Sequence, residues 1–326
     1  MVQYRLSVVI PTRNRQDSIV RLLKNMCSQT LSPDAFEVVV VDDGSTPPLE
    51  ESTISAGLPF STRVIRRTSE PGAHASRFAG LRAARGERVL FLDDDVFLEP
   101  EVLAQHSGNA GSFAIGPILY HPDARTSAYQ RFQTKRYADY AVAVAREQRI
   151  PVSELYICNS SGPKDLFTAA FEGVDALVRG ISVPGDGMDE ELLCYQLRGS
   201  KGWAPFLPKA LILHIDTKTV REARREKQHR AKVQANLLLQ FPDLRAGFGL
   251  MAASHRKRVV RLFWMMPRVF RLVASVFALV ADLPGRWVPT WICYPPLAIA
   301  FWEGINSVAP RYDQLSAALR TGSEPE

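Results

Sequence analysis

Short apolar runs alternate with amphipathic segments along the first 92 residues of the chain. Four short runs predict strands, of which 5–11 and 36–41 read as buried and 62–66 and 87–92 follow as the third and fourth. Between these strands, 16–29 and 73–84 carry apolar residues at the spacing of a helix face. Because strands and helices alternate, we expect an α/β fold in which helices cover both faces of a mainly parallel sheet.

The middle of the chain continues this pattern less regularly. It predicts a strand at 112–115, helices at 136–149, 163–179 and 188–198, and a short strand at 210–214 that ends in a histidine. After this strand the composition changes. We therefore expect one domain over 1–215 and a mainly helical C-terminal extension over 216–326.

Overall composition is that of a globular protein, with 46% hydrophobic and 23% charged residues. The four cysteines are scattered without metal-like spacing, which indicates a reducing compartment and no disulfide framework. The first strand begins near Arg5, so we expect no N-terminal signal peptide.

The net charge of +6 is unevenly distributed, because 217–271 holds 14 Lys and Arg against three Asp and Glu. Basic residues there are interleaved with aromatic and aliphatic ones, and the apolar run at 272–281 is too short to cross a bilayer. This pattern predicts peripheral contact with an anionic membrane through 217–304. The alternative is an ordinary helical subdomain. Nucleic-acid binding is disfavoured, because the basic segment is rich in aliphatic residues and contains no recognised reader motif.

The strand at 87–92 runs directly into three consecutive carboxylates, Asp93, Asp94 and Asp95. Adjacent like charges are unfavourable unless something compensates for them, and Mg²⁺ or Mn²⁺ prefers oxygen ligands of this kind. Ligands of α/β sheets bind at the carboxyl ends of the strands, which is where this triplet lies. For the triplet taken alone, a solvated acidic turn is the less favoured alternative.

Two further strand ends are expected at the same edge of the sheet. The first strand leads into 11–15, Pro-Thr-Arg-Asn-Arg, and the second leads into 42–46, Asp-Asp-Gly-Ser-Thr. A carboxylate there can accept a hydrogen bond from the N–H of a nucleotide base, and arginines and backbone N–H groups can hold phosphates. Alone, the second segment would be a plain turn.

Together these segments resemble the family 2 glycosyltransferases, which have the GT-A fold. Residues 7–15 are similar to the opening strand and nucleotide loop of that family, and 39–46 to its second strand and base-binding turn. Residues 71–80 are similar to the following loop and helix, and 91–95 to the metal-binding DXD motif. The four segments occur in the order and at the spacing of that family, and the resemblance covers about 6–214.

The resemblance implies a role for each matching residue. Asp42 or Asp43 would accept from the base, with Asp42 favoured, and Arg77 would contact base or phosphate. The residues that would bind the nucleotide-sugar are Pro11, Thr12, Arg13, Asn14, Asp42, Asp43, Arg77, Asp93 and Asp94. The residues that would hold Mg²⁺ or Mn²⁺ are Asp95, Asp93 and His214.

An acidic segment at 187–192 resembles the helix start that carries the catalytic base in the same family. Asp189 matches that base, although Met188 replaces the preceding acid. A single base with no matching nucleophile implies one displacement and therefore inversion. Outside this context, these acids could equally be charges favoured by a helix N-terminus. The Gly-Gly-Phe-Asp-Glu-like segment usual before the base is matched only loosely by 171–176.

The implied function is an inverting, metal-dependent hexosyltransferase that moves a sugar from a nucleotide-diphospho-sugar, by default a UDP-sugar, to a hydroxyl. The basic C-terminal segment favours a glycan or lipid-linked acceptor in cell-envelope synthesis, and a cytoplasmic location at the inner face of the cell membrane.

A sugar-phosphate nucleotidyltransferase is disfavoured, because it needs a glycine-rich phosphate loop and 11–15 lacks those glycines. A nicotinamide dehydrogenase is disfavoured, because no G-x-G-x-x-G sequence follows the first strand. A non-catalytic, membrane-associated nucleotide-binding protein is the remaining alternative. The joint presence of Asp93, Asp95 and Asp189 argues against it.

Overall fold

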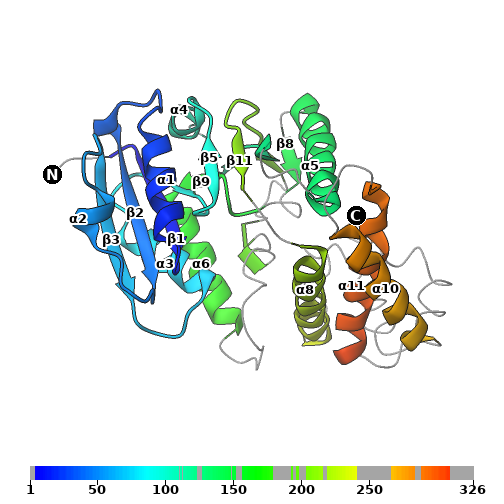
Figure 1. Cartoon of the computed structure of the whole chain (residues 1–326). Coiled ribbons are helices and arrows are strands. Elements are labelled where there is room, and N and C mark those ends of the chain that lie inside the picture. The colour runs from blue at the N-terminus through cyan, green and yellow to red at the C-terminus, as the bar shows by residue number, and fades with distance from the viewer. Residues whose placement is uncertain are drawn as a thin grey trace. The chain divides into compact units, whose positions relative to one another are not determined.

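The computed structural model divides the chain into two compact units (Figure 1). The described residues are 4–109, 111, 113–122, 127–147, 149–151, 156–178, 192–193, 196–197, 203–215, 219–240, 266–282 and 288–308. The first unit comprises 1–121, 137–179 and 196–216, and the second comprises 122–136, 180–195 and 217–326. The division into 1–215 and 216–326 stays a prediction.

The first unit contains a six-stranded sheet in the order β3-β2-β1-β4-β9-β6. The first four strands of this order are parallel, and β9 runs antiparallel to both β4 and β6. The strands are β1 (Leu6–Thr12), β2 (Phe36–Asp43), β3 (Ser61–Arg67), β4 (Arg88–Phe91), β6 (Ala114–Ile115) and β9 (Ser160–Pro163). The mainly parallel sheet expected from the sequence is confirmed.

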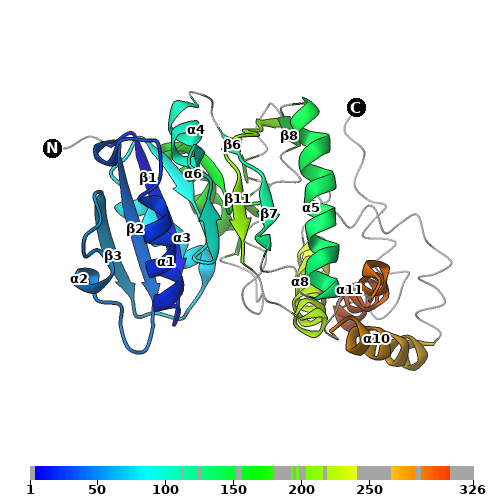
Figure 2. The same cartoon turned by 45° about the horizontal axis from the view of Figure 1, so that its top comes forward.

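Helices cover both faces of this sheet, as Figures 1 and 2 show. One face packs Val8 and Val40 into a core with α1 (Gln16–Met26), α2 (Glu51–Ile54) and α4 (Val102–Gly108). On the other face lie α3 (Ala73–Ala83) and α6 (Lys164–Val178). A Cβ at Gly80 would lie 2.3 Å from Val9 Cγ1, so only glycine lets α3 approach β1 this closely.

Two smaller sheets complete the first unit. The three-stranded sheet has the order β5-β11-β7, with β5 (Val96–Leu98) antiparallel and β7 (Ile118–Tyr120) parallel to β11 (Ile212–His214). The other sheet pairs β8 (Arg149–Pro151) with β10 (Trp203–Pro205). In the register of β11 and β5, His214 lies opposite Val96, which places the histidine beside the acidic triplet.

A buried polar cluster joins the six-stranded and three-stranded sheets. Asn159, at φ 63°, donates from its side-chain amide to the backbone oxygens of Pro117 (3.0 Å) and Ala210 (2.7 Å). Its Oδ1 lies 2.9 Å from His106 Nε2, and Ser161 Oγ lies 2.9 Å from Nδ1 of the same ring. Burial lowers the pKa of His106 to about 4, so the ring is neutral near pH 7 and satisfies both contacts.

Several predicted elements differ in length from the observed ones. The helix expected at 16–29 ends at Met26, and the helix expected at 136–149 is α5 (Ala128–Glu147). The earlier start of α5 has a local cause, because Ser127 and Gln130 each accept a hydrogen bond from the other's backbone N–H. Most of the helix expected at 188–198 lies outside the described residues.

The second unit is helical in its described part. It contains α8 (Val220–Gln240), α10 (Pro267–Ala281), the 3₁₀ turn η6 (Thr290–Cys293), α11 (Tyr294–Val308) and the first half of α5. The buried Glu303 of α11 accepts from Arg224 of α8 (3.2 Å) and Arg271 of α10 (2.9 Å), which links the three helices. Within the described residues, no helix is both long and apolar enough to cross a bilayer.

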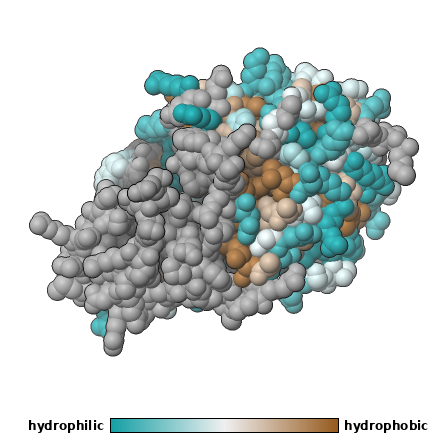
Figure 3. Space-filling model, turned by 180° about the vertical axis from the view of Figure 1, so that it is seen from behind, coloured by the Kyte–Doolittle hydropathy of each residue, from teal (hydrophilic) through white to brown (hydrophobic). Residues whose placement is uncertain are grey.

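Polar side chains cover most of the coloured surface in Figure 3, and hydrophobic ones gather in a smaller area of that face. Eight large hydrophobic side chains are exposed among the described residues. Seven of them lie between 266 and 291, and the eighth is Val142. Among the described residues, the large exposed hydrophobic side chains are therefore concentrated on α10 and η6, which is not the hydrophobic area seen in Figure 3.

Candidate functional site

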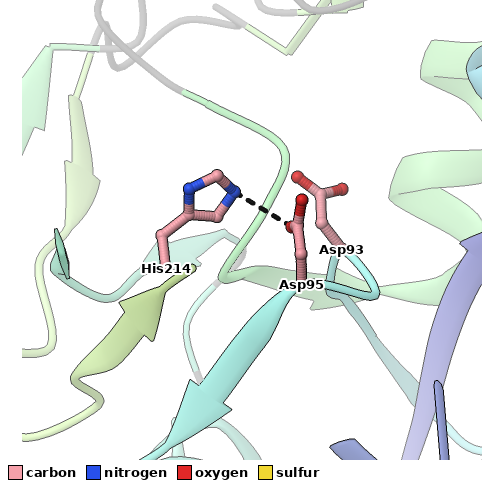
Figure 4. Close-up of side chains that lie close together, drawn as sticks. All are labelled: Asp93, Asp95 and His214. Carbon is pink, nitrogen blue, oxygen red and sulfur yellow. Dashed lines mark ion pairs between the residues drawn. The ribbon is translucent and has the colours of Figure 1, made fainter. Parts of the chain in front are cut away.

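Asp93, Asp95 and His214 lie together at the carboxyl edge of the six-stranded sheet (Figure 4). Their ligand atoms all lie within 4.8 Å of one another. The two aspartates belong to the connection between β4 and β5, whereas His214 ends β11, far along the chain. The structure thus brings together the three residues expected to hold a metal.

Two nitrogen-bearing side chains, an imidazole and a guanidinium, face the Asp95 carboxylate. His214 Nε2 lies 3.0 Å from its Oδ1, and Arg15 Nη1 lies 3.0 Å from its Oδ2. Burial alone would raise the pKa of Asp95, but the contacts with His214 and Arg15 outweigh burial and lower the pKa to about 2. Asp95 is therefore ionised throughout the physiological range.

Asp94 does not belong to this group of three residues. Its side chain is buried, accepts a hydrogen bond from the Thr12 hydroxyl at 2.6 Å and pairs with Arg15 at 3.0 Å. Burial raises its pKa, although Thr12 and Arg15 act in the opposite direction. Asp94 thereby ties the acidic triplet to the end of β1.

Asp42 and Asp43 end β2, and both are engaged by the protein. Asp42 is fully buried and accepts from the backbone N–H groups of Ser45 (2.8 Å) and Leu49 (3.1 Å) and from Arg66 (2.8 Å). Burial alone would raise the pKa of Asp42, but these hydrogen bonds and the charge of Arg66 lower it.

Asp43 is slightly more accessible than Asp42, at 8% exposure. It pairs with Arg67 and accepts from the backbone N–H of Gly72 at 2.8 Å. The turn after β2 is therefore held to the start of α3. Of the two carboxylates, Asp43 is the one that reaches the surface.

The loop after β1 is fixed to the turn after β2. Asn14, at φ 55°, donates from its backbone N–H to Ser45 Oγ (2.9 Å), and its Oδ1 accepts from the Thr46 N–H (2.8 Å). At the end of β1, Pro11 is half-buried and Thr12 is buried, and Arg13 in the loop is exposed. The two loops expected to form a nucleotide pocket thus form one connected edge.

Arg77 of α3 also reaches the acidic group. Its Nη2 donates to Asp93 Oδ1 at 2.8 Å, and its side chain is mostly buried. Asp189 lies outside the described residues.

Arg15, Arg66 and Arg67 contact the acidic residues of this edge but are absent from the sequence-based list. Arg15 could have been included, because it ends the 7–15 segment that carries the family resemblance.

The donor set suits a divalent cation. Two carboxylates and one imidazole offer oxygen and nitrogen atoms close enough to share one ion. Arg15 pairs with Asp95 and Arg77 pairs with Asp93, so neither carboxylate carries an unpaired buried charge. Mg²⁺ or Mn²⁺ would fit these residues.

Part of this chain matches a known protein family. Residues 7–167 match the model of glycosyl transferase family 2. The validoxylamine A glucosyltransferase of Streptomyces hygroscopicus subsp. limoneus is 36% identical over 129 residues, which cover 37% of this chain and 28% of that protein. The undecaprenyl-phosphate 4-deoxy-4-formamido-L-arabinose transferase of Pseudomonas fluorescens is 32% identical over 139 residues, covering 40% of this chain and 39% of that protein.

The match to a solved structure extends over more of the chain. The mannosyltransferase PcManGT from Pyrobaculum calidifontis, solved in complex with GDP-Man and Mn²⁺, superimposes with a TM-score of 0.50 at 16% identity. The superposition covers 99% of this chain and 77% of that one and bears on the fold alone. By sequence, the chain spans only about a third of the length of the curated relatives it matches. The match over 7–167, which includes the acidic residues that end β2 and follow β4, identifies this part of the chain as glycosyl transferase family 2 sequence.

Proposed function

We propose that this protein is an inverting, metal-dependent glycosyltransferase that uses a nucleotide-diphospho-sugar, a UDP-sugar by default. The observation that carries the proposal is the convergence of Asp93, Asp95 and His214 at the sheet edge that also holds the 11–15 and 42–46 loops. Family membership supports sugar transfer as the reaction class.

The donor would lie along this edge. Asp43 is the better acceptor for a base N–H, because Asp42 is fully buried and already receives three donors. Arg77 lies beside Asp93, where it would meet ribose or phosphate. A divalent cation on Asp93, Asp95 and His214 would supply charge neutralisation for the departing diphosphate.

Asp189 would act as the base. In a single displacement the acceptor oxygen attacks the anomeric carbon, the bond to the diphosphate breaks, and the acceptor proton passes to the Asp189 carboxylate. Inversion follows because the attack comes from the face opposite the leaving group. This role rests on the resemblance of 187–192 to the family's acidic helix start.

A donor screen tests the proposal directly. Purified protein would be incubated with UDP-, GDP- and dTDP-sugars, with and without Mn²⁺, while thermal stability and release of free nucleotide are followed. GDP-mannose belongs in the panel because PcManGT is solved with GDP-Man and Mn²⁺. We expect one donor to stabilise the protein only when Mn²⁺ is present. A folded protein that responds to no donor would contradict the proposal.

We also propose that 217–304 contacts the inner face of the cell membrane and that the acceptor is a glycan or a lipid-linked molecule. The outward face of α10 supports this proposal. This helix turns three alanines inward and exposes large aliphatic side chains at Val269, Leu272, Val273, Val276 and Leu279. The exposed positions follow the spacing of one helix face. Arg268 and Arg271 are exposed at the N-terminal end of the helix.

An apolar helix face flanked by cations suits the boundary between anionic headgroups and acyl chains. Trp291, 58% exposed beside Phe277, is the residue type that prefers this boundary. The relative from Pseudomonas fluorescens, whose name specifies undecaprenyl-phosphate, makes a lipid-linked acceptor a reasonable first choice.

Replacing Leu272 and Val276 together by glutamate is expected to weaken binding to vesicles that contain anionic lipid by about 10-fold or more. Each buried aliphatic side chain contributes about 1.5–3 kcal/mol, and the new charges oppose the lipid. Vesicle co-sedimentation would measure the loss, with Val142→Glu as the control at an exposed apolar position outside α10. Equal binding by both variants would remove the membrane role from this face.

A further inference from the structure

Each carboxylate of the proposed metal site is paired with one arginine, but the two arginines differ. Arg77 Nη2 lies 2.8 Å from Asp93 Oδ1, and its side chain is only 10% exposed. Arg15 Nη1 lies 3.0 Å from Asp95 Oδ2, and its side chain is 54% exposed. Arg77 is therefore held by its surroundings, whereas the Arg15 guanidinium can turn without disturbing a packed core.

Arg15 occupies a position that a metal ion would need. Asp95 Oδ1 faces His214 and Asp95 Oδ2 faces Arg15, so both oxygens already have a nitrogen neighbour at 3.0 Å. The same Nη1 lies 3.0 Å from Asp94 Oδ1, which places one cationic group between two adjacent carboxylates. A divalent cation that binds Asp95 must share this carboxylate with the guanidinium or displace it.

The backbone of Arg15 is fixed independently of its side chain. Its carbonyl oxygen accepts from the N–H of Ile19 at 3.1 Å and so begins α1. Asn14 before it is anchored to the 42–46 turn through Ser45 and Thr46. Substituting the side chain should therefore leave both the loop and the start of α1 in place.

We propose that Arg15 is the resident counter-cation of the acidic triplet and that it makes metal binding conditional on the donor. Without donor, the guanidinium repels a divalent cation and competes with it for Asp95. The diphosphate of the donor brings negative charge to which an arginine on this loop can donate. The guanidinium then leaves Asp95 Oδ2 for the diphosphate, so the cation and the nucleotide favour each other's binding. This inference rests on the proposed metal site.

The test measures binding rather than turnover. Mn²⁺ would be titrated by isothermal calorimetry and by electron paramagnetic resonance into wild type, Arg15→Gln, Arg15→Lys and Lys24→Gln. Each titration would be done with and without UDP. Lys24 is an exposed cation on α1, so Lys24→Gln removes the same charge at a distance from the triplet.

We expect Arg15→Gln to bind Mn²⁺ about 10-fold more tightly than wild type without UDP, because a cation next to the site has been removed. With Mn²⁺ saturating, the same variant should bind UDP more weakly. The factor by which UDP tightens Mn²⁺ binding should therefore fall. Arg15→Lys keeps the charge and should stay near wild type in the titration without UDP, and Lys24→Gln should match wild type throughout.

The outcomes separate the two proposals. If wild type binds no Mn²⁺ with or without UDP, the metal site itself fails. If wild type binds Mn²⁺ but Arg15→Gln binds it equally or more weakly without UDP, Arg15 is not a competing cation and this inference is overturned. A loss of affinity in Arg15→Gln for both Mn²⁺ and UDP would instead indicate a purely structural role for Arg15.

Discussion

Replacing Asp95 by asparagine is expected to abolish metal-dependent binding of the nucleotide-sugar. The substitution keeps the shape of the side chain but removes the charge from a carboxylate that lies 3.0 Å from His214 and is held ionised by its neighbours. Loss of a residue next to a metal ligand typically costs about 10–100-fold in metal affinity, and loss of a ligand should cost at least the upper end of that range. Mn²⁺ titration and donor-induced thermal shift would measure the effect.

Glu99→Gln is the matched control for this variant. Glu99 follows β5, four positions beyond Asp95, and its side chain is exposed outside the metal group. It should retain wild-type responses to Mn²⁺ and donor. The Asp95 variant should remain folded, because asparagine keeps the shape of the side chain and an oxygen that can accept from Arg15, although the charge pairing is lost. Undiminished metal-dependent donor binding in a folded Asp95→Asn protein would show that the cation binds elsewhere.

Replacing Asp189 by asparagine is expected to lower turnover by about 10²–10⁴-fold while donor affinity stays near that of wild type. A positioned general base typically contributes this factor to the rate, and asparagine cannot take the proton from the acceptor hydroxyl. Nucleotide release from the donor in the absence of acceptor is a suitable first assay, because the same base would activate water. Calorimetric titration with UDP and Mn²⁺ would report donor affinity.

Glu190→Gln serves as the neighbouring control, because it removes a carboxylate from the same acidic segment. A large loss in both variants would mean that the segment acts through its overall charge. If Asp189→Asn instead lost donor affinity with little change in turnover at saturating donor, Asp189 would belong to the donor site. The role of base would then have to be assigned to another residue.

The core of the fold follows from the sequence because its signals are local. The strands around Val8 and Val40 are short, apolar and β-branched, and α1 shows a clear helical period. β9 is different, because its sequence Ser-Ser-Gly-Pro has little strand propensity and its pairing with β4 and β6 is imposed by the surrounding structure. The early start of α5 could have been found from Ser127 and Gln130, which have capping-box spacing.

The residue types at the strand ends predicted where the candidate site lies, but not the hydrogen bonds and ion pairs that each residue makes there. Asp93 and Asp95 could be placed at this edge in advance because a parallel sheet gathers its strand ends there. His214 ends a strand of the separate three-stranded sheet, and only the family resemblance grouped it with them. The inward direction of Asp94 and the full burial of Asp42 depend on loop conformation, which sequence periodicity does not encode. The pairing of Arg15 with Asp95 joins residues 80 positions apart and needed the folded chain.

The Asn159 cluster has a consequence for how the metal group is assembled. The Asn159 side chain holds the backbone just before β7 and just before β11. The strand that follows Asn159, β9, pairs with β4, which leads into Asp93. The relative positions of His214 and the two aspartates are thus set by buried hydrogen bonds rather than by flexible loops. The ligand atoms are preorganised, so the conformational entropy of gathering them is lost during folding and does not weaken the affinity for an ion.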